Sequence, residues 1–462
     1  MELPTLFQDR MQRQLGAEWP YFTTALDSPP PVSIRAHPTK TAGFPLLKPI
    51  PWAQTGYYLP ERPQFTLDPW IHAGAYYVQE AASMLVEQAL RAWMPSDTPV
   101  RALDLCAAPG GKSTHLSQLL PEGSLLVANE VIQLRAHILA ENLQKWGTGH
   151  VIVTRNDPRD FQRLPDFFDL VLADVPCSGE GLFRREPEAV AEWSQHHLQL
   201  CADRQRRIIG DIWPSLRPGG VLLYSTCTWN PAENEDNIRW ITDELGADCL
   251  RLHPDPAWGL TEYQTGGITG YACLPHRMQG EGFFIAGLRK HGTYQPPARP
   301  EKTPPLPPVP KADATQLLSW SRTPEGLGAY MVGDTCILLP EVLAPAAAQV
   351  VKHLHVIFCG VEAAQRKGKD LIPQHALALW TGLKPDVWTQ TPLELPEALA
   401  FLKKETIPLD APGGWTLITY RGLPLGFAKQ IGHRMNNYYP QHWKIRMNLP
   451  ATLPVPFWEI LS

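Results

Sequence analysis

This chain of 462 residues lacks the marks of several common protein classes. No apolar run approaches the ~20 residues that a helix needs to cross a bilayer. The opening segment MELPTLFQDRMQ has no basic stretch followed by an apolar one, which is the order of a secretory signal. No two of the eight cysteines form a CxxC pair, so we expect no zinc site and reduced thiols. These absences predict a cytoplasmic protein without metal or membrane contact.

Positive charge is also scarce, since the net charge is −5, and any nucleic-acid binding must depend on local patches. The clearest patch lies between Asp410 and Glu459, where no other acidic residue occurs. Cations neutralise phosphates and flat rings stack on unpaired bases. The composition therefore fits RNA binding as well as it fits a small β domain with a solvated basic face. The basic residues are Arg421, Lys429, Arg434, Lys444 and Arg446, and the interleaved aromatic residues are Tyr420, Phe427, Tyr438, Tyr439 and Trp443.

Proline indicates how the chain is divided. The segment 293–311, TYQPPARPEKTPPLPPVPK, lacks many backbone donors and favours extended polyproline conformation. It predicts a stiff linker between the first two thirds of the chain and the last third. A second boundary is expected near 391–396, TPLELP.

Apolar strand-like runs alternate with helical patterns between residues 80 and 290. This alternation predicts an α/β fold whose mainly parallel sheet is covered on both faces, with ligands bound beyond the carboxyl ends of the strands. The predicted strands are 100–106, 125–130, 151–154, 169–176, 221–227 and 282–288, and the predicted helices are 113–120, 132–145, 188–213 and 233–245.

The loop after the first predicted strand is LDLCAAPGGKS, residues 103–113. Gly110 and Gly111 let the backbone approach a ligand, and Ser113 and Thr114 are candidates to cap the following helix. Neither GxGxxG nor GxxxxGK occurs, so binding of a dinucleotide or nucleoside triphosphate is not supported. By itself, the loop fits an ordinary strand–helix turn.

Two acids make a ligand site the better interpretation. Glu130 ends the second predicted strand and Asp157 follows the third. At these places a carboxylate can accept hydrogen bonds from ribose hydroxyls or from an adenine amino group.

Two cysteines follow neighbouring strands, Cys177 in DVPCSG and Cys227 in YSTCT. Adjacent strand ends in a parallel sheet lie about 5 Å apart, so both thiols can face one pocket beside Asp174. The other cysteines are expected only to pack, as buried cysteines usually do. They are Cys106, Cys201, Cys249, Cys273, Cys336 and Cys359.

This set of side chains suits methylation of cytosine at carbon 5, which is a poor nucleophile. A thiolate that adds to carbon 6 turns the ring into an enamine, which attacks through carbon 5. Asp174 can stabilise the charge near ring nitrogen 3. A second thiolate can then remove the proton on carbon 5 so that the first thiol leaves. The residues themselves leave open which cysteine attacks.

The motifs AAPGGK, DVPCSGEG and YSTCTWNPAENE resemble those of the ribosomal-RNA 5-methylcytosine methyltransferases of the RsmB, RsmF and Sun group, over roughly residues 70–290. The segment 179–189 resembles the RsmF-type branch, and residues 76–80 resemble a helix that precedes the first strand. The segment GFAKQIGHRMNNYYP resembles the RNA-binding PUA-like module of that branch. The resemblance implies a Rossmann-like S-adenosylmethionine-dependent methyltransferase core with a small N-terminal α/β domain and a C-terminal PUA-like β domain.

The resemblance also implies individual roles. Cys227 would be the nucleophile and Cys177 would help to release the product, whereas DNA cytosine methyltransferases attack with the cysteine at the position of Cys177. Asp174 would lie next to the methyl donor and the target base, Glu130 would bind ribose and Asp157 would bind adenine. The remaining residues expected to contact S-adenosylmethionine are Ala107, Ala108, Pro109, Gly110, Gly111, Lys112, Ser113 and Arg135.

The sequence thus predicts a monomeric RNA (cytosine-5-)-methyltransferase that acts on small-subunit ribosomal RNA. Alternatives are the same chemistry on transfer RNA, a non-catalytic RNA-binding ribosome-assembly factor, and a DNA cytosine methyltransferase. The two cysteines and three cofactor carboxylates argue against the assembly factor, and the TC motif and the C-terminal module argue against the DNA enzyme. The expected domains are 1–70 (RNA-recognition-like), 71–292 (catalytic), 293–311 (linker), 312–390 (accessory) and 391–462 (PUA-like, RNA-binding).

Overall fold

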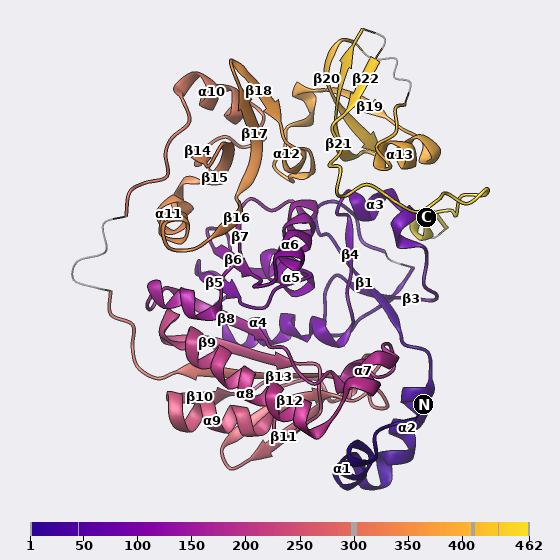
Figure 1. Ribbon diagram of the computed structural model, residues 1–462, viewed down its shortest axis with the longest axis vertical. Helices are drawn as coiled ribbons and strands as arrows, with labels where there is room; N and C mark the ends of the chain where they lie inside the picture. Colours follow the sequence, from indigo (N-terminus) through magenta and orange to yellow (C-terminus); the bar gives the residue numbers. More distant parts are fainter. Residues whose placement is uncertain (1, 45, 297–302, 408–411, 433, 461–462) are drawn as a thin grey trace.

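The computed structural model describes residues 2–44, 46–296, 303–407, 412–432 and 434–460. Within these ranges, the centre of the molecule is one large sheet in the order β11-β12-β13-β9-β8-β5-β6-β7-β16, with β10 paired to β13 (Figure 1). Strands β5 to β9 run parallel, and β13 runs antiparallel beside β9. Its strands are β5 (Arg101–Asp104), β6 (Leu125–Asn129), β7 (Val151–Thr154), β8 (Phe168–Asp174), β9 (Leu216–Thr226), β10 (Ala247–Leu250), β11 (Thr261–Thr265), β12 (Ile268–Cys273), β13 (Phe283–Lys290) and β16 (Val356–Cys359).

All six strands predicted from the sequence lie in this sheet, which confirms the α/β prediction. They were recognisable because both of their faces are buried, so each reads as an unbroken apolar run. Strand β11 was missed because its sequence, TEYQT, is mostly polar and exposed.

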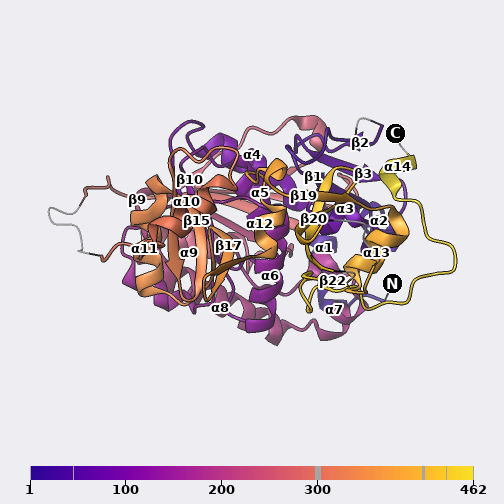
Figure 2. The same cartoon turned by 90° about the horizontal axis from the view of Figure 1, so that it is seen from above.

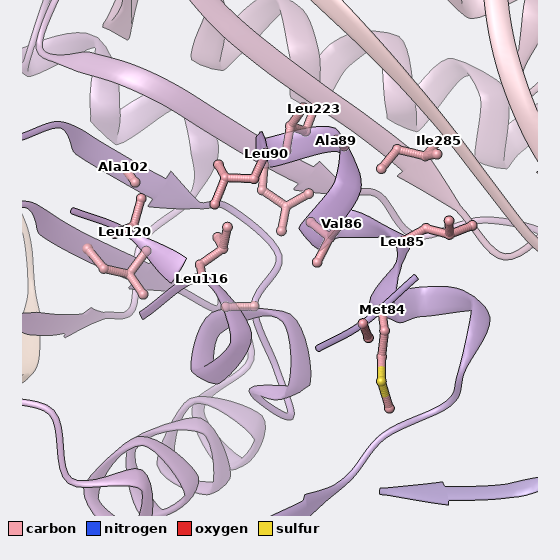
Figure 3. Close-up of a cluster of buried hydrophobic side chains, with 14 of the residues drawn as sticks. Met84, Leu85, Val86, Ala89, Leu90, Ala102, Leu116, Leu120, Leu223 and Ile285 are labelled. Atoms are coloured by element: carbon pink, nitrogen blue, oxygen red, sulfur yellow. The ribbon is translucent and has the colours of Figure 1, made fainter. Parts of the chain in front are cut away.

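Helices cover both faces of the sheet. On one face lie α4 (Val86–Trp93), α5 (Gly111–Leu119) and α6 (Gln133–Trp146). Figure 3 shows side chains of α4 and α5 against Ala102, Leu223 and Ile285 of the sheet. On the other face lie α8 (Gln195–Ile212), α9 (Glu235–Leu245) and α11 (Ala344–His353). The short helix α7 (Pro187–Glu192) precedes α8.

The N-terminal part forms a layer of its own beside the large sheet (Figure 1). Helices α1 (Thr5–Leu15) and α2 (Trp19–Asp27) precede a sheet of order β2-β3-β1-β4, and α3 (Pro69–His72) precedes its last strand. The helix expected at residues 76–80 is wrong, because Tyr76–Val78 is strand β4 and pairs with β1. Aromatic and β-branched residues favour this extended pairing. The other strands are β1 (Val32–Ala36), β2 (Lys48–Pro49) and β3 (Gly56–Leu59).

Two further small sheets follow, and residues 297–302 of the predicted linker lie outside the described residues. The first has the order β14-β15-β17-β18 and the second β19-β20-β21-β22. Their elements are α10 (Lys311–Ser319), β14 (Leu327–Val332), β15 (Thr335–Pro340), β17 (Val361–Lys367), β18 (Asp370–Pro373), α12 (His375–Leu379), β19 (Thr389–Pro392), α13 (Leu395–Leu402), β20 (Gly414–Tyr420), β21 (Leu423–Ile431), β22 (Arg434–Asn437) and α14 (Phe457–Ile460).

The C-terminal third packs against both earlier parts of the chain. Strand β16 pairs antiparallel with β7, so the segment 312–390 contributes an edge strand to the large sheet. The C-terminal helix α14 lies beside the N-terminal sheet (Figure 2). There the Trp458 ring stacks on Trp70 at 3.7 Å between centroids, and its Nε1 donates to Asp68. The C-terminal third therefore contacts both the large sheet and the N-terminal part. None of the helices described here is long and apolar enough to cross a membrane.

Candidate active site at the carboxyl edge of the sheet

The two predicted cysteines meet where β8 and β9 end. The register pairs Asp174 with Ser225, which places the following loops side by side. The Sγ atoms of Cys177 and Cys227 are 3.0 Å apart, and the Cys227 N–H donates to Cys177 Sγ at 3.3 Å. Both thiols are half-buried and free. The structure therefore brings together the two thiols that the strand ends predicted.

The thiol pair is asymmetric. The hydrogen bond to Cys227, followed by burial, raises the pKa of Cys177 well above its ordinary value. Cys177 therefore keeps its proton and can donate it in a hydrogen bond to Cys227 Sγ.

Asp174 is held by two donors. Lys112 Nζ donates to Oδ2 at 2.8 Å and Ser225 Oγ donates to Oδ1 at 2.7 Å. Burial by itself lowers the pKa of Lys112, but the charge of Asp174 and the hydrogen bond to it outweigh burial and raise this pKa. The ammonium also lies 5.2 Å from the centre of the Phe283 ring. Lys112 therefore points at Asp174, although the resemblance assigned it to the cofactor.

A cavity of about 390 Å³ lies in front of these groups, and we call it the cysteine cavity. Cys227 lines it and Cys177 does not. Residues of the N-terminal sheet and of the entry to β13 complete its wall. Of the predicted site residues, those that line it are Ala107, Ala108, Pro109, Gly111, Lys112, Asp174 and Cys227, and those that do not are Gly110, Ser113, Glu130, Arg135, Asp157 and Cys177.

Asp104, at the end of β5, is a site residue that the sequence reasoning missed. Burial raises its pKa to about 7, its Oδ1 has no hydrogen-bond partner in the described structure, and it lines the cysteine cavity. Ser113 Oγ donates to its other oxygen at 2.6 Å. The prediction that Ser113 or Thr114 caps α5 is therefore wrong, since Gly110 is the N-cap, with a φ of 116° that favours glycine. The signal available was an acid at a strand end, in LDLC.

The other two predicted cofactor acids lie outside the cysteine cavity. Glu130 is buried, its Oε1 accepts from the Ile132 N–H at 3.0 Å, and its Oε2 lies 3.3 Å from Arg135. Arg135 also donates to the Ala108 carbonyl, which ties the loop to the end of β6. Asp157 caps the turn that begins at Pro158 and is 44% exposed.

Two buried carboxylates that were not predicted hold the cysteine loops in place. Glu233 accepts from the N–H and the hydroxyl of Ser178, which follows Cys177, and burial raises its pKa to about 7. Glu180 forms a 2.6 Å ion pair with Arg10 of α1, and Arg10 also donates to the carbonyl of Trp229 at 3.0 Å. The N-terminal helix thus joins both loops, and no local pattern indicated this contact.

The C-terminal patch differs from its expected form. Arg421 lies near Glu394 and Glu459, so its charge is balanced there. Arg434 and Arg446 are exposed, while Lys429 and Lys444 are half-buried. Only Tyr438 among the five aromatic residues is exposed, so base stacking by the others is ruled out. Tyr420, Phe427, Tyr439 and Trp443 are buried in the domain core.

Three protein-family models match the chain: 16S rRNA methyltransferase RsmB/F at residues 92–289, the N-terminal domain of 16S rRNA methyltransferase RsmF at 3–81, and the methyltransferase RsmF PUA domain at 389–445. A ribosomal RNA small subunit methyltransferase F from Pectobacterium atrosepticum is 33% identical over 86% of this chain and 84% of its own length. One from Erwinia tasmaniensis is 30% identical over 95% and 96%. The structure of a methyltransferase homolog from Pyrococcus horikoshii is 29% identical, with a TM-score of 0.53, and covers 62% of this chain and 95% of that one.

Proposed function

This chain belongs to the family of 16S rRNA methyltransferases RsmB/F, and we propose that it methylates carbon 5 of a cytosine in small-subunit ribosomal RNA through a covalent cysteine–cytosine adduct. The observation that carries this proposal is the pair of thiols 3.0 Å apart beside the Lys112–Asp174 ion pair. Transfer to a ring nitrogen or a ribose oxygen needs no sulfur nucleophile, because those atoms carry their own lone pairs. Two thiols at the end of the sheet support transfer to carbon.

The residues around the cavity fit S-adenosylmethionine, which supplies the methyl group when bound. Asp104 offers an oxygen without a hydrogen-bond partner, suited to the ammonium of the methionine part. The loop from Ala107 to Gly111 lies against the same cavity, and we assign it to the methionine and ribose parts. Glu130 and Asp157 remain our candidates for the ribose hydroxyls and the adenine amino group.

The first step is attack by Cys227. Its thiolate forms a bond to carbon 6 of the cytosine, and the electrons of the ring double bonds move towards nitrogen 3. Lys112 Nζ lies 2.8 Å from Asp174 Oδ2. This pair supplies the proton that nitrogen 3 takes up, and the carboxylate accepts from the cytosine amino group. The ring becomes an enamine whose carbon 5 takes the methyl group.

The second step removes the proton from carbon 5, and Cys177 is our candidate base. In the free protein its hydrogen bond to Cys227 contributes most to its raised pKa. Once the Cys227 sulfur is bonded to carbon 6, it is an uncharged thioether, and that contribution disappears. Cys177 then gives its own proton to solvent more readily, and its thiolate takes the proton from carbon 5. The electrons of that bond form the carbon 5–carbon 6 double bond, the carbon 6–sulfur bond breaks to return Cys227 as a thiolate, and nitrogen 3 returns its proton to the Lys112–Asp174 pair.

Bisulfite sequencing tests the proposal directly. Total RNA from a strain that lacks the gene is expected to lose at least one protected cytosine in its small-subunit ribosomal RNA. A strain that carries only the Cys227→Ala protein should lose the same cytosine. If the lost cytosine lies in a transfer RNA, the RNA class proposed here is wrong. If no cytosine changes, the carbon 5 chemistry is wrong.

Asp104 should make cofactor binding depend on pH. Because burial raises its pKa to about 7, Asp104 loses its charge as the pH falls below that value, and an ammonium group then binds more weakly. Asp104→Asn keeps an oxygen that can accept from the Ser113 hydroxyl but lacks the negative charge. It should weaken S-adenosylmethionine binding by about 1–3 kcal/mol at pH 8. Calorimetry at pH 6 and pH 8 checks both points. An equal affinity at both pH values in the wild type would remove Asp104 from the cofactor site.

A further inference from the structure

A second hollow, of about 570 Å³, adjoins the cysteine cavity, and we call it the entrance groove. Four residues line both spaces, Val78, Gln79, Glu80 and Arg185. The outer wall comes from the N-terminal domain: residues 29–33, which include the start of β1, and residues 59–62, which include the end of β3. The two hollows together form a path from the N-terminal domain to Cys227.

Two consecutive arginines in this region have different surroundings. Arg184 is 6% exposed, forms an ion pair with Glu281, and donates to the carbonyls of Ala25 and Gly280. Its charge is balanced and its donors are in use. Arg185 is exposed and lies where the two hollows meet, and no described carboxylate lies within ion-pair distance of it. Its guanidinium is available to a ligand.

The outer wall of the groove holds a second available cation. Arg62 is exposed, and its guanidinium carbon lies 5.5 Å from the centre of the Phe65 ring. Among the described residues, no carboxylate lies within ion-pair distance of it. Of the two acids in the groove, Glu80 already accepts from three backbone N–H groups, those of Ala82, Ser83 and Glu281, and Glu61 is exposed to solvent. The groove thus has two free guanidinium groups, Arg185 at its junction with the cysteine cavity and Arg62 on its outer wall.

We propose that the entrance groove binds the RNA strand on either side of the target cytosine, and that Arg185 and Arg62 contact its phosphates. This inference rests on the proposed function. A cytosine that reaches Cys227 must leave its stack, while its sugar–phosphate chain stays continuous with the neighbouring nucleotides. The flanking phosphates therefore lie at the mouth of the cysteine cavity, where Arg185 lies. A planar guanidinium suits a phosphate because it can donate two parallel hydrogen bonds.

The test compares two short single-stranded RNAs that each contain one central cytosine. One has natural linkages, and the other has uncharged methylphosphonate linkages on both sides of the cytosine. Dissociation constants of both are measured across a salt series, without S-adenosylmethionine, for the wild type, Arg185→Ala and Arg62→Ala. Arg251→Ala is the matched control, because Arg251 is exposed and lines neither the cysteine cavity nor the entrance groove.

Arg185→Ala is expected to bind the natural RNA about tenfold more weakly, the loss of a charge-assisted contact. The slope of its salt dependence should fall by about 0.7, which corresponds to one phosphate. The uncharged linkages remove the contacts of both arginines, so they should weaken wild-type binding by about a hundredfold and Arg185→Ala by only about tenfold further, because one of the two contacts is already absent there. Arg62→Ala should behave alike, and Arg251→Ala like the wild type. Melting temperatures should not change, since both arginines are exposed.

Fully additive losses from the substitution and from the uncharged linkages would overturn the assignment of Arg185. Unchanged binding by Arg62→Ala would overturn the part assigned to the N-terminal domain. Because these experiments measure binding and not methylation, they can fail while the bisulfite experiment succeeds, and the reverse also holds.

Discussion

Cys177→Ala is expected to accumulate a protein–RNA adduct that survives a denaturing gel, and Cys227→Ala is expected to form none. The two sulfurs are 3.0 Å apart, but only Cys227 lines the cysteine cavity, and the two thiols act at different steps of the proposed reaction. Without Cys227 no bond to carbon 6 can form. Without Cys177 the bond forms and the methyl group is transferred, but the loss of a general base slows release by roughly 10²–10⁴.

The adduct experiment uses unmodified small-subunit ribosomal RNA with S-adenosylmethionine. Cys249→Ala is the control, because Cys249 lies on β10, away from the carboxyl ends of the parallel strands, and should turn over like the wild type. An adduct with Cys227→Ala and none with Cys177→Ala would reverse the two roles and match the order used by DNA cytosine methyltransferases. No adduct with either variant, on RNA that the wild type methylates, would contradict the covalent mechanism.

Lys112→Met is expected to lower the rate of methyl transfer by about 10²–10³, the usual cost of removing one group that stabilises developing charge. Its affinity for S-adenosylmethionine should stay close to that of the wild type. The reason is where Lys112 points: its Nζ lies 2.8 Å from Asp174, and the two form the pair that we assign to nitrogen 3 of the cytosine. Single-turnover rates and calorimetry separate the two quantities.

Lys112→Arg is the matched control for charge, since it keeps a cation beside Asp174 and should recover part of the rate. If Lys112→Met instead loses affinity for S-adenosylmethionine in proportion to its loss of rate, then Lys112 holds the cofactor, as the AAPGGK resemblance implied. In that case its hydrogen bond to Asp174 does not serve the transfer step.

Local sequence determined the catalytic core. The six strands that carry it were predictable because strands buried on both faces are continuous apolar runs, and a parallel sheet places the residues after such strands at one edge. These two facts were enough to predict that Cys177, Cys227 and Asp174 lie close to one another. The assignment of the attack to Cys227 came from the motif resemblance, since the two thiols occupy equivalent positions in the fold.

Only the tertiary structure decided which polar and aromatic side chains remain available. Tyr420 and Trp443 looked suited to base stacking by composition, and both are buried. The two neighbouring arginines look alike in the sequence, yet Arg184 is neutralised by Glu281, 97 residues away, and Arg185 is free to bind a ligand. Arg10 and Glu180 are 170 residues apart and hold the two cysteine loops together. The periodicity of apolar residues indicates which positions are buried. Whether a charged side chain can bind a ligand depends on whether an opposite charge lies within a few ångströms of it, and long-range packing decides that.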